Sequence, residues 1–131
     1  MRFFQAIGSF FCFLAISAAA MSSHMLHPFL SDPDIRAVQT AIFFALFHGI
    51  VLLVVPKGAD LSANQSKIIS LLWMLGIIGF SVSIFLLKLG IAHSWDAMKI
   101  IGPITPFGGG LLILSWLYLF FILLKRNSST N

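Results

Sequence analysis

Residues 102–110 read GPITPFGGG and stand at the entrance to the last apolar stretch of the chain. Helix-breaking residues are unexpected at the edge of a membrane segment, but their order here suits the start of a helix. Gly102 and Pro103 can turn the chain, and Thr105 is placed as an N-cap before Pro106. Proline is favoured at the first position of a helix, because its missing N–H would have no partner there anyway. The stretch therefore predicts a helix that begins at about residue 105.

Three glycines, Gly108, Gly109 and Gly110, follow in the first turns of this predicted helix. Each glycine costs about 1 kcal/mol relative to alanine inside an exposed helix, so three in a row indicate a specific packing contact. Small residues let two helices approach closely in lipid. We expect this entrance to pack against the first or second helix near His24, and a bulky residue at Gly109 to impair folding or assembly.

The composition is typical of a membrane protein. Of the 131 residues, 59% are hydrophobic and 9% are charged, whereas an average soluble protein has about 25% charged residues. With so few charges to cover a surface, the apolar side chains are expected to face lipid. The net charge of +4 is spread along the chain without a basic run, so nothing in the sequence indicates nucleic-acid binding.

Four apolar runs are long enough to cross a bilayer, which takes about 20 residues at 1.5 Å each. They predict one transmembrane domain over residues 1–131, of the all-α class, built as a bundle of four helices with short loops. The lipid bilayer is the first partner of such a bundle. The expected helices cover residues of about 3–26, 33–55, 63–89 and 105–125.

The first run also resembles a secretory signal peptide, because a basic residue precedes it and three alanines at 18–20 lie near its end. The run is long for a signal peptide, however, and it continues beyond the alanines. Small residues at every fourth position form a stripe that suits helix packing in lipid: Ala15, Ala19 and Ser23. We therefore expect this segment to be retained as a membrane helix.

The distribution of basic residues predicts the orientation. Four spans place both termini and the central loop on one side of the membrane. That side has five basic residues and the other has three: Arg2, Lys57, Lys67, Lys125 and Arg126 against Arg36, Lys88 and Lys99. Because cytoplasmic loops are enriched in lysine and arginine, we expect both termini in the cytoplasm. Lys88, near the end of its span, is expected to snorkel to the headgroups.

His48 is the most unusual residue, because it lies near the middle of the second span. An ionisable side chain at this depth normally faces the bundle interior and suggests a function such as proton relay or ligand binding. A neutral imidazole can also join two helices through a hydrogen bond, here with Ser81 or Ser83 of the third span. Gly49 beside it would allow the close approach. We favour the structural interpretation.

Copper binding is a further hypothesis, for the end of the first span. His24, Met25 and His27 offer imidazole and thioether ligands, which suit Cu(I). No Cys-x-x-Cys or His-x-x-x-His motif accompanies them, so we expect no metal and no cofactor. The chain also lacks a P-loop ending after its glycines and a nucleophile paired with a base. We therefore expect no enzymatic activity and no catalytic residue.

Several residues, taken in order, resemble the pattern of a known family. Small residues lead to a histidine in the first helix, an aromatic residue precedes a histidine in the second, two serines lie in the third, and Ile-Thr-Pro-x-Gly-Gly opens the fourth. In this chain they are His24, Phe47-His48, Ser81, Ser83 and Ile104-Thr105-Pro106-Phe107-Gly108-Gly109. This pattern resembles the domain-of-unknown-function family numbered 423, which is similar to the small transmembrane-protein-256 group. The resemblance covers nearly the whole chain.

The resemblance implies a four-helix integral protein of the bacterial inner membrane, or of an organellar inner membrane in a eukaryote. It also implies that the first helix is retained. Members often have a tyrosine before the second histidine, where this chain has Phe47. The hydroxyl that might join a polar network with His48 is therefore missing, which weakens a proton-relay role. The family brings no activity, substrate or cofactor with it.

Three functions are compatible with these features. The first is a non-enzymatic structural, accessory or assembly component of a membrane complex, with a membrane-protein partner or a second copy of the chain. The second is an oligomeric small-solute or ion transporter or channel that uses His48. The third is a membrane copper-binding protein. Short loops, small packing residues and the lack of a soluble domain favour the first.

Overall fold

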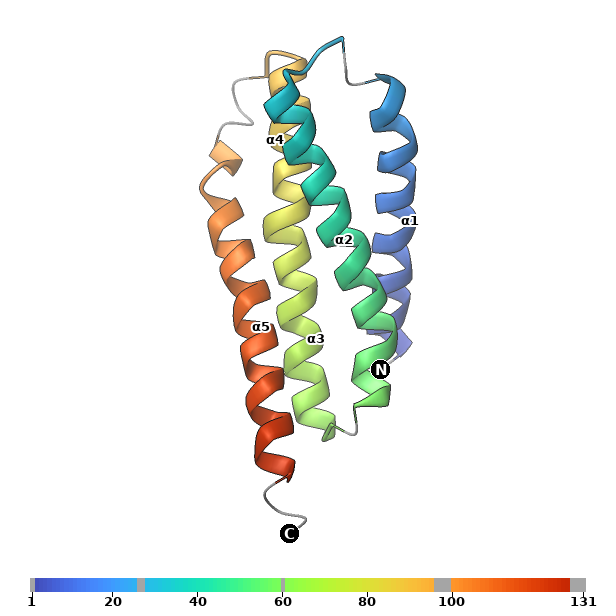
Figure 1. Ribbon diagram of the computed structural model, residues 1–131, viewed down its shortest axis with the longest axis vertical. Coiled ribbons are helices and arrows are strands. Elements are labelled where there is room, and N and C mark those ends of the chain that lie inside the picture. The colour runs from blue at the N-terminus through green and yellow to red at the C-terminus, as the bar shows by residue number, and fades with distance from the viewer. Residues whose placement is uncertain (1, 26–27, 60, 96–99, 128–131) are drawn as a thin grey trace.

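The computed structural model is a bundle of long helices without strands in its described part, which covers residues 2–25, 28–59, 61–95 and 100–127 (Figure 1). The side chains of residues 23–25, 126 and 127 are not part of this description. The elements are α1 (Arg2–Met25), α2 (Asp32–Gly58), α3 (Ala63–Ile77), the π-helix η1 (Ile78–Val82), α4 (Ser83–Ala92) and α5 (Ile104–Asn127). The predicted all-α class is confirmed.

The described residues form four candidate membrane spans, because α3, η1 and α4 run on as one continuous helical segment over Ala63–Ala92. Each span is long and apolar enough for a bilayer. The observed bounds differ from the predicted ranges by at most three residues at any end. The start of α1 and the end of α5 lie at the same end of the bundle, together with the α2–α3 connection (Figure 1).

Local sequence signals set two of the helix starts. The Ser31 hydroxyl caps α2 by accepting a hydrogen bond from the Asp34 amide at 3.4 Å, and Pro33 lies in the first turn. A capping box opens α3: the Ser62 hydroxyl accepts from the Gln65 amide at 3.3 Å, and the Gln65 side chain accepts from the Ser62 amide at 3.0 Å. These contacts satisfy N–H groups that have no partner inside the helix.

Helices α1 and α2 form one close antiparallel pair. The Gln5 side-chain amide donates to the Leu53 carbonyl at 3.0 Å. One turn along, the two backbones approach at a pair of glycines, and a Cβ built on Gly8 would lie 2.6 Å from the Gly49 carbonyl oxygen. A separation under 3 Å is not available to a real Cβ, so glycine is required at this contact. Gly49 therefore serves the first helix, and it does not bring the third span toward His48 as the sequence suggested.

The predicted small-residue stripe of α1 is used only in part. Ala15 is 3% exposed, whereas Ala19 is exposed, and the side chain of Ser23 lies outside the described residues. The closest approach lies nearer the start of the helix, at Gly8. A four-residue spacing drifts around a helix of 3.6 residues per turn, so a stripe of three small residues does not stay on one contact line.

Helix α5 forms a second close antiparallel pair, with α3 and η1. Three contacts follow one another in register: Gly76 with Leu112, Gly79 with Gly108, and Ser83 with Thr105. At the middle contact no side chain separates the helices. A Cβ built on Gly108 would lie 2.1 Å from the carbonyl carbon of Gly79 and 2.2 Å from the amide nitrogen of Phe80. These neighbours are backbone atoms that cannot turn aside.

The prediction that this entrance packs against the first or second helix was therefore wrong, because its partner is the third span. Gly108 makes the backbone contact. Gly109 faces the Phe80 ring, and a Cβ built on Gly109 would lie 3.3 Å from the nearest ring carbon. A Cβ built on Gly110 would have no neighbouring atom within 4 Å outside its own stretch of helix. The glycines of the first two helices, Gly8 and Gly49, already pack against each other. Gly79 of the third span is therefore the glycine against which Gly108 of α5 packs.

The predicted N-cap role of Thr105 was also wrong. Helix α5 begins one residue earlier, at Ile104, and the Thr105 amide donates to the Gly102 carbonyl at 3.3 Å. Pro106 is consequently the third residue of the helix. The Thr105 hydroxyl reaches across to Ser83 at 2.8 Å. Since the single Ser83 hydroxyl hydrogen is directed to carbonyl oxygens of its own span, Thr105 donates and Ser83 accepts.

The π-helix is a feature that the sequence did not predict, since the third span was expected to be a continuous α-helix. Five residues, Ile78–Val82, form the wide turn. The Ser83 amide, just beyond it, bonds with the carbonyl of Ile78, five residues back. Single π-turns inside α-helices are frequent at functional sites. This one lies where the third span meets α5 through Gly79.

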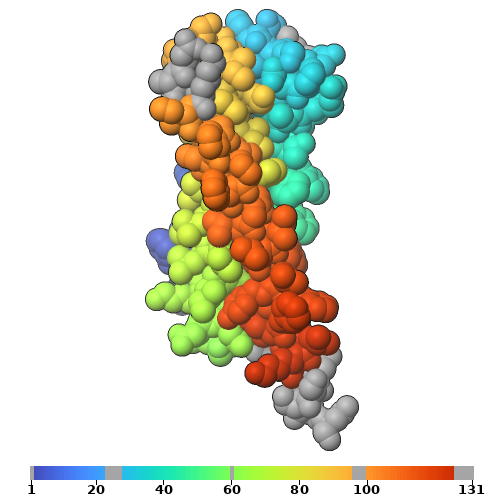
Figure 2. Space-filling view, turned by 90° about the vertical axis from the view of Figure 1, so that its left-hand side faces the viewer, coloured from blue at the N-terminus to red at the C-terminus, as the bar shows by residue number. Residues whose placement is uncertain are grey.

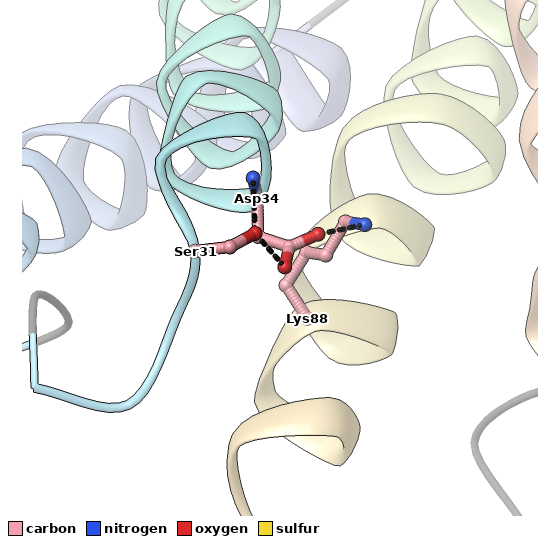
Figure 3. A network of polar contacts seen from close by, with 3 residues as sticks. All are labelled: Ser31, Asp34 and Lys88. Atoms are coloured by element: carbon pink, nitrogen blue, oxygen red, sulfur yellow. Dashed lines mark hydrogen bonds and ion pairs between the residues drawn. The ribbon is translucent and has the colours of Figure 1, made fainter.

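A polar network joins the start of α2 to α4 (Figure 3), at the end of the bundle away from the termini (Figure 1). The Lys88 ammonium lies 2.6 Å from Asp34 Oδ1, and the Ser31 hydroxyl donates to Asp34 Oδ2 at 2.5 Å. The two charged side chains are only 20% and 22% exposed. Lys88 thus has an acidic partner, whereas the sequence suggested a lysine reaching the headgroups alone. Each carboxylate oxygen of Asp34 has a hydrogen-bond partner. An ion pair that is shielded from water is favourable only if its remaining polar atoms are hydrogen-bonded in this way.

The Gly79–Gly108 contact predicts a large difference between neighbouring glycines. Gly108→Ala places a Cβ inside backbone atoms of the third span, and overpacking of this kind costs at least about 2 kcal/mol. We expect a clear loss of unfolding free energy in detergent micelles titrated with a denaturing detergent. Gly110→Ala is the matched control on the same helix. It adds the same methyl group to open space, so it should be neutral or stabilising by up to about 1 kcal/mol; equal effects at both positions would contradict the contact.

Candidate functional site

His48 lies in α2 with 3% of its surface exposed, on the side of the helix that faces α5. Aromatic rings enclose the imidazole. The ring of Phe44 stacks on it with centroids 5.7 Å apart, the ring of Phe47 meets it edge-on at 5.1 Å, and the indole of Trp116 lies at 6.1 Å. The side chain is thus held between its own helix and the last span.

Hydrogen bonds fix the proton on the imidazole. The Trp116 indole nitrogen lies 3.0 Å from Nε2, and the Phe44 carbonyl oxygen lies 2.9 Å from Nδ1. An indole N–H can only donate, so Nε2 is the acceptor, and a carbonyl can only accept, so Nδ1 carries the hydrogen. His48 is therefore a neutral imidazole with both nitrogens engaged. It joins two helices, as the structural interpretation of the sequence expected.

The predicted partners of this imidazole were wrong. The Ser83 hydroxyl is directed to the carbonyls of Gly79 and Phe80 at 2.5 and 2.9 Å and pairs with α5. The Ser81 hydroxyl is buried and has no partner among the described residues. The reason is the direction of the imidazole, because α2 presents His48 to α5 and not to the third span.

An apolar cleft of about 400 Å³ opens beside His48, between α2 and α5. Figure 2 shows α5 in front, with α3 at its lower left and α2 at its upper right. Five aromatic rings line the cleft: Phe43, Phe44, Phe47, Phe80 and Trp116. At its rim, Phe43 is 62% exposed and Ile113 on α5 is 70% exposed. Stacking of Phe43 on Phe47, with centroids 6.2 Å apart, fixes one wall.

The arrangement suits packing better than chemistry. His48 is the only ionisable side chain among the described residues that line the cleft, and neither of its nitrogens is free. Binding a metal or accepting a proton at Nε2 would require the Trp116 bond to break. No group of three or more potential metal ligands occurs in the described part of the chain.

The copper hypothesis concerns residues that the structure does not describe in side-chain detail. His24 and Met25 belong to the last turn of α1, where only the helix itself is described, and His27 lies outside the described residues. The copper hypothesis therefore stays a prediction.

Trp116 is the site residue that the sequence reasoning missed. Tryptophan in membrane helices concentrates at the interfaces, whereas this one lies inside the final span. Its indole N–H needs an acceptor when it is withdrawn from water. A mid-span tryptophan and a mid-span histidine could therefore have been paired from the sequence, as a donor and an acceptor at similar depth.

Comparison with known proteins supports the assignment of this bundle to a family. The family described as "Protein of unknown function (DUF423)" matches residues 18–109, which include His48, the π-helix and the glycine entrance to α5. The chain belongs to this family. Trp116, the partner of His48, lies beyond the matched segment.

Several bacterial relatives match nearly the whole length of the chain. A UPF0382 membrane protein of Staphylococcus epidermidis is 30% identical over 125 residues, covering 95% of this chain and 98% of the relative. The UPF0382 membrane protein YwdK of Bacillus subtilis is 28% identical over 119 residues, covering 89% and 92%. A UPF0382 membrane protein of Haemophilus influenzae is 28% identical over 123 residues, covering 94% and 92%. No solved structure matches the chain.

The His48–Trp116 bond predicts an energetic coupling between α2 and α5. Trp116→Phe keeps an aromatic ring, although a smaller one, and removes the N–H donor, so it should lower the unfolding free energy by at least about 1–2 kcal/mol. Combined with His48→Ala in a double-mutant cycle, we expect a coupling energy of about 0.5–2 kcal/mol, the range of interhelical hydrogen bonds in membranes. Trp95→Phe, at an exposed surface position, is the control and should show no coupling to His48→Ala.

The same bond predicts the protonation state of the imidazole. In ¹⁵N-labelled protein in micelles, His48 should show a protonated Nδ1 and an unprotonated Nε2. The reason is that the Phe44 carbonyl accepts the hydrogen of Nδ1, whereas the Trp116 indole N–H donates to Nε2. The Trp116→Phe variant should lose this uniform tautomer. Observation of the opposite tautomer in the unaltered protein would contradict the hydrogen-bond assignment.

Proposed function

We propose that this chain is a non-enzymatic accessory or assembly component of a membrane complex, and that another membrane protein packs into its α2–α5 cleft. The observation that carries the proposal is the cleft itself: a concave surface of about 400 Å³ lined by aromatic rings. Aromatic side chains are enriched at the cores of protein interfaces and at the residues that contribute most to binding. The fixed His48–Trp116 pair keeps the two walls in place without offering a reactive group.

The proposal extends to the membrane in which the protein works. The spans are helices, whereas proteins that cross bacterial outer membranes do so as β-barrels. We propose the inner membrane of a bacterium, or the inner membrane of an organelle in a eukaryotic cell, with both termini in the cytoplasm or matrix as the basic residues predict.

A substitution at the rim of the cleft tests this function. The tagged protein, extracted from its native membrane in a mild detergent, should migrate as a defined complex larger than its own micelle. Phe43→Ala combined with Ile113→Ala removes two exposed side chains from the rim, and loss of interface anchors costs more than about 1 kcal/mol each. We expect at least a tenfold decrease of the complex at equal protein level.

The control variant removes two exposed apolar side chains from a different surface, on α1. Phe13 and Ile16 are 63% and 59% exposed on α1 and do not line the cleft. Phe13→Ala with Ile16→Ala should leave the complex intact. Recovery of the unaltered protein only as a free monomer would overturn the proposal, as would equal effects of the two double variants.

A further inference from the structure

A second apolar groove lies on the other side of α2, between α1 and the third span. Its walls come from residues 11–21 of α1, residues 41–45 of α2 and residues 81–89 of η1 and α4, and its volume is about 340 Å³. A smaller cavity of about 220 Å³ shares Ala18, Met21, Phe85 and Leu89 with it and continues toward the surface, as far as Phe29 and His93. Because they share these four residues, the two cavities form one groove, which we call the α1–α4 groove.

The groove has the length of one membrane leaflet. Its deeper part extends along α1 from Phe11 to Met21, which corresponds to about 15 Å at 1.5 Å per residue. Half of a hydrocarbon core of roughly 30 Å is also about 15 Å. Phe11 lies near the middle of α1, and His93 follows the last residue of α4. The groove therefore leads from the middle of the bilayer to the surface away from the termini.

The cross-section of the groove suits one hydrocarbon chain. A volume of about 340 Å³ spread over about 15 Å gives a mean section of roughly 20 Å². Carbon atoms in contact lie about 4 Å apart, so a single chain occupies a column of similar width. A helix, with a diameter of about 10 Å, would need roughly four times that section. These walls can therefore enclose a single hydrocarbon chain, whereas a whole helix could only lie along their rim.

The polarity of the lining changes along the groove in the way an amphiphile requires. Among the described residues that line it, none is charged, and the deep part is aliphatic or aromatic except for Ser17 and Ser81. The one titratable side chain among these residues is His93, at the surface end; it is exposed, and its ring centroid lies 5.3 Å from that of Trp95, with the two rings tilted by 36°. Tryptophan beside a polar ring is typical of the headgroup level of a membrane.

The geometry points to a lipid site: the α1–α4 groove binds one acyl chain of a glycerophospholipid from the leaflet away from the termini, with its headgroup next to His93. Small residues on opposite walls, Ala18 on α1 and Ala45 on α2, make room for the chain. The bound chain fills a space that the bundle's own side chains leave open, and it links α1 to α4, which otherwise meet mainly through α2.

The test compares two alanines on the same helix. Ala18 lines both parts of the groove, whereas Ala20 is exposed and lies outside its lining. Protein purified from its native membrane in a mild detergent is examined by native mass spectrometry, and its phospholipid is extracted and quantified. The unaltered protein should retain about one phospholipid per chain. Ala18→Phe, which fills the groove, should retain at least fivefold less, and Ala20→Phe should retain the same amount as the unaltered protein.

A labelling experiment on the unaltered protein keeps the proposal testable if Ala18→Phe fails to fold. A phosphatidylcholine with a diazirine near the end of one acyl chain is incorporated into vesicles with the protein and photolysed. Crosslinks should concentrate on the deep lining residues of the groove, such as Phe11, Ala15 and Phe85. Labels spread evenly over the lipid-facing surface, including Phe120 and Leu124, would overturn the proposal, and so would retention of lipid by a folded Ala18→Phe variant.

Discussion

The backbone contact between Gly79 and Gly108 is the constraint on which the rest of the C-terminal half depends. It sets the distance between α5 and the third span below what any side chain would allow. At that distance the Thr105 hydroxyl reaches the Ser83 hydroxyl. In the same register, the ring centroids of Trp116 and Trp73 lie 5.5 Å apart. Trp116 is then in position to donate to His48 on α2. One contact without side chains thus positions one of the polar bonds that join α2 to the C-terminal half of the bundle.

The architecture could be predicted from the sequence because it follows from local rules. Length and apolarity define a span, and serine followed by glutamine or proline defines a helix start. The π-helix could not be found in this way. Its residues, Ile78–Val82, include a glycine and a serine, but both residue types are also common in continuous membrane helices. Their presence alone therefore does not predict a π-helix.

The candidate site was predictable in kind but not in its partners. A histidine at membrane depth implied a hydrogen bond between helices, and His48 makes one. The choice of Trp116 over Ser81 or Ser83 depends on the rotation of α2 about its axis. The Gly8–Gly49 contact with α1 restricts that rotation, and in the resulting orientation His48 points to Trp116 on α5 and not to the two serines of the third span. Rotation of whole helices is a tertiary property, and no spacing within one segment records it.

The ion pair between Lys88 and Asp34 has a consequence for the order in which the protein enters the membrane. A lysine is among the costliest residues to transfer into a bilayer as part of a helix. Helix α2 is synthesised before the third span, so the Asp34 carboxylate, which Ser31 holds in the folded bundle, is part of the chain before its partner Lys88. The counter-charge of the lysine is therefore carried by a helix that is made before the span that needs it.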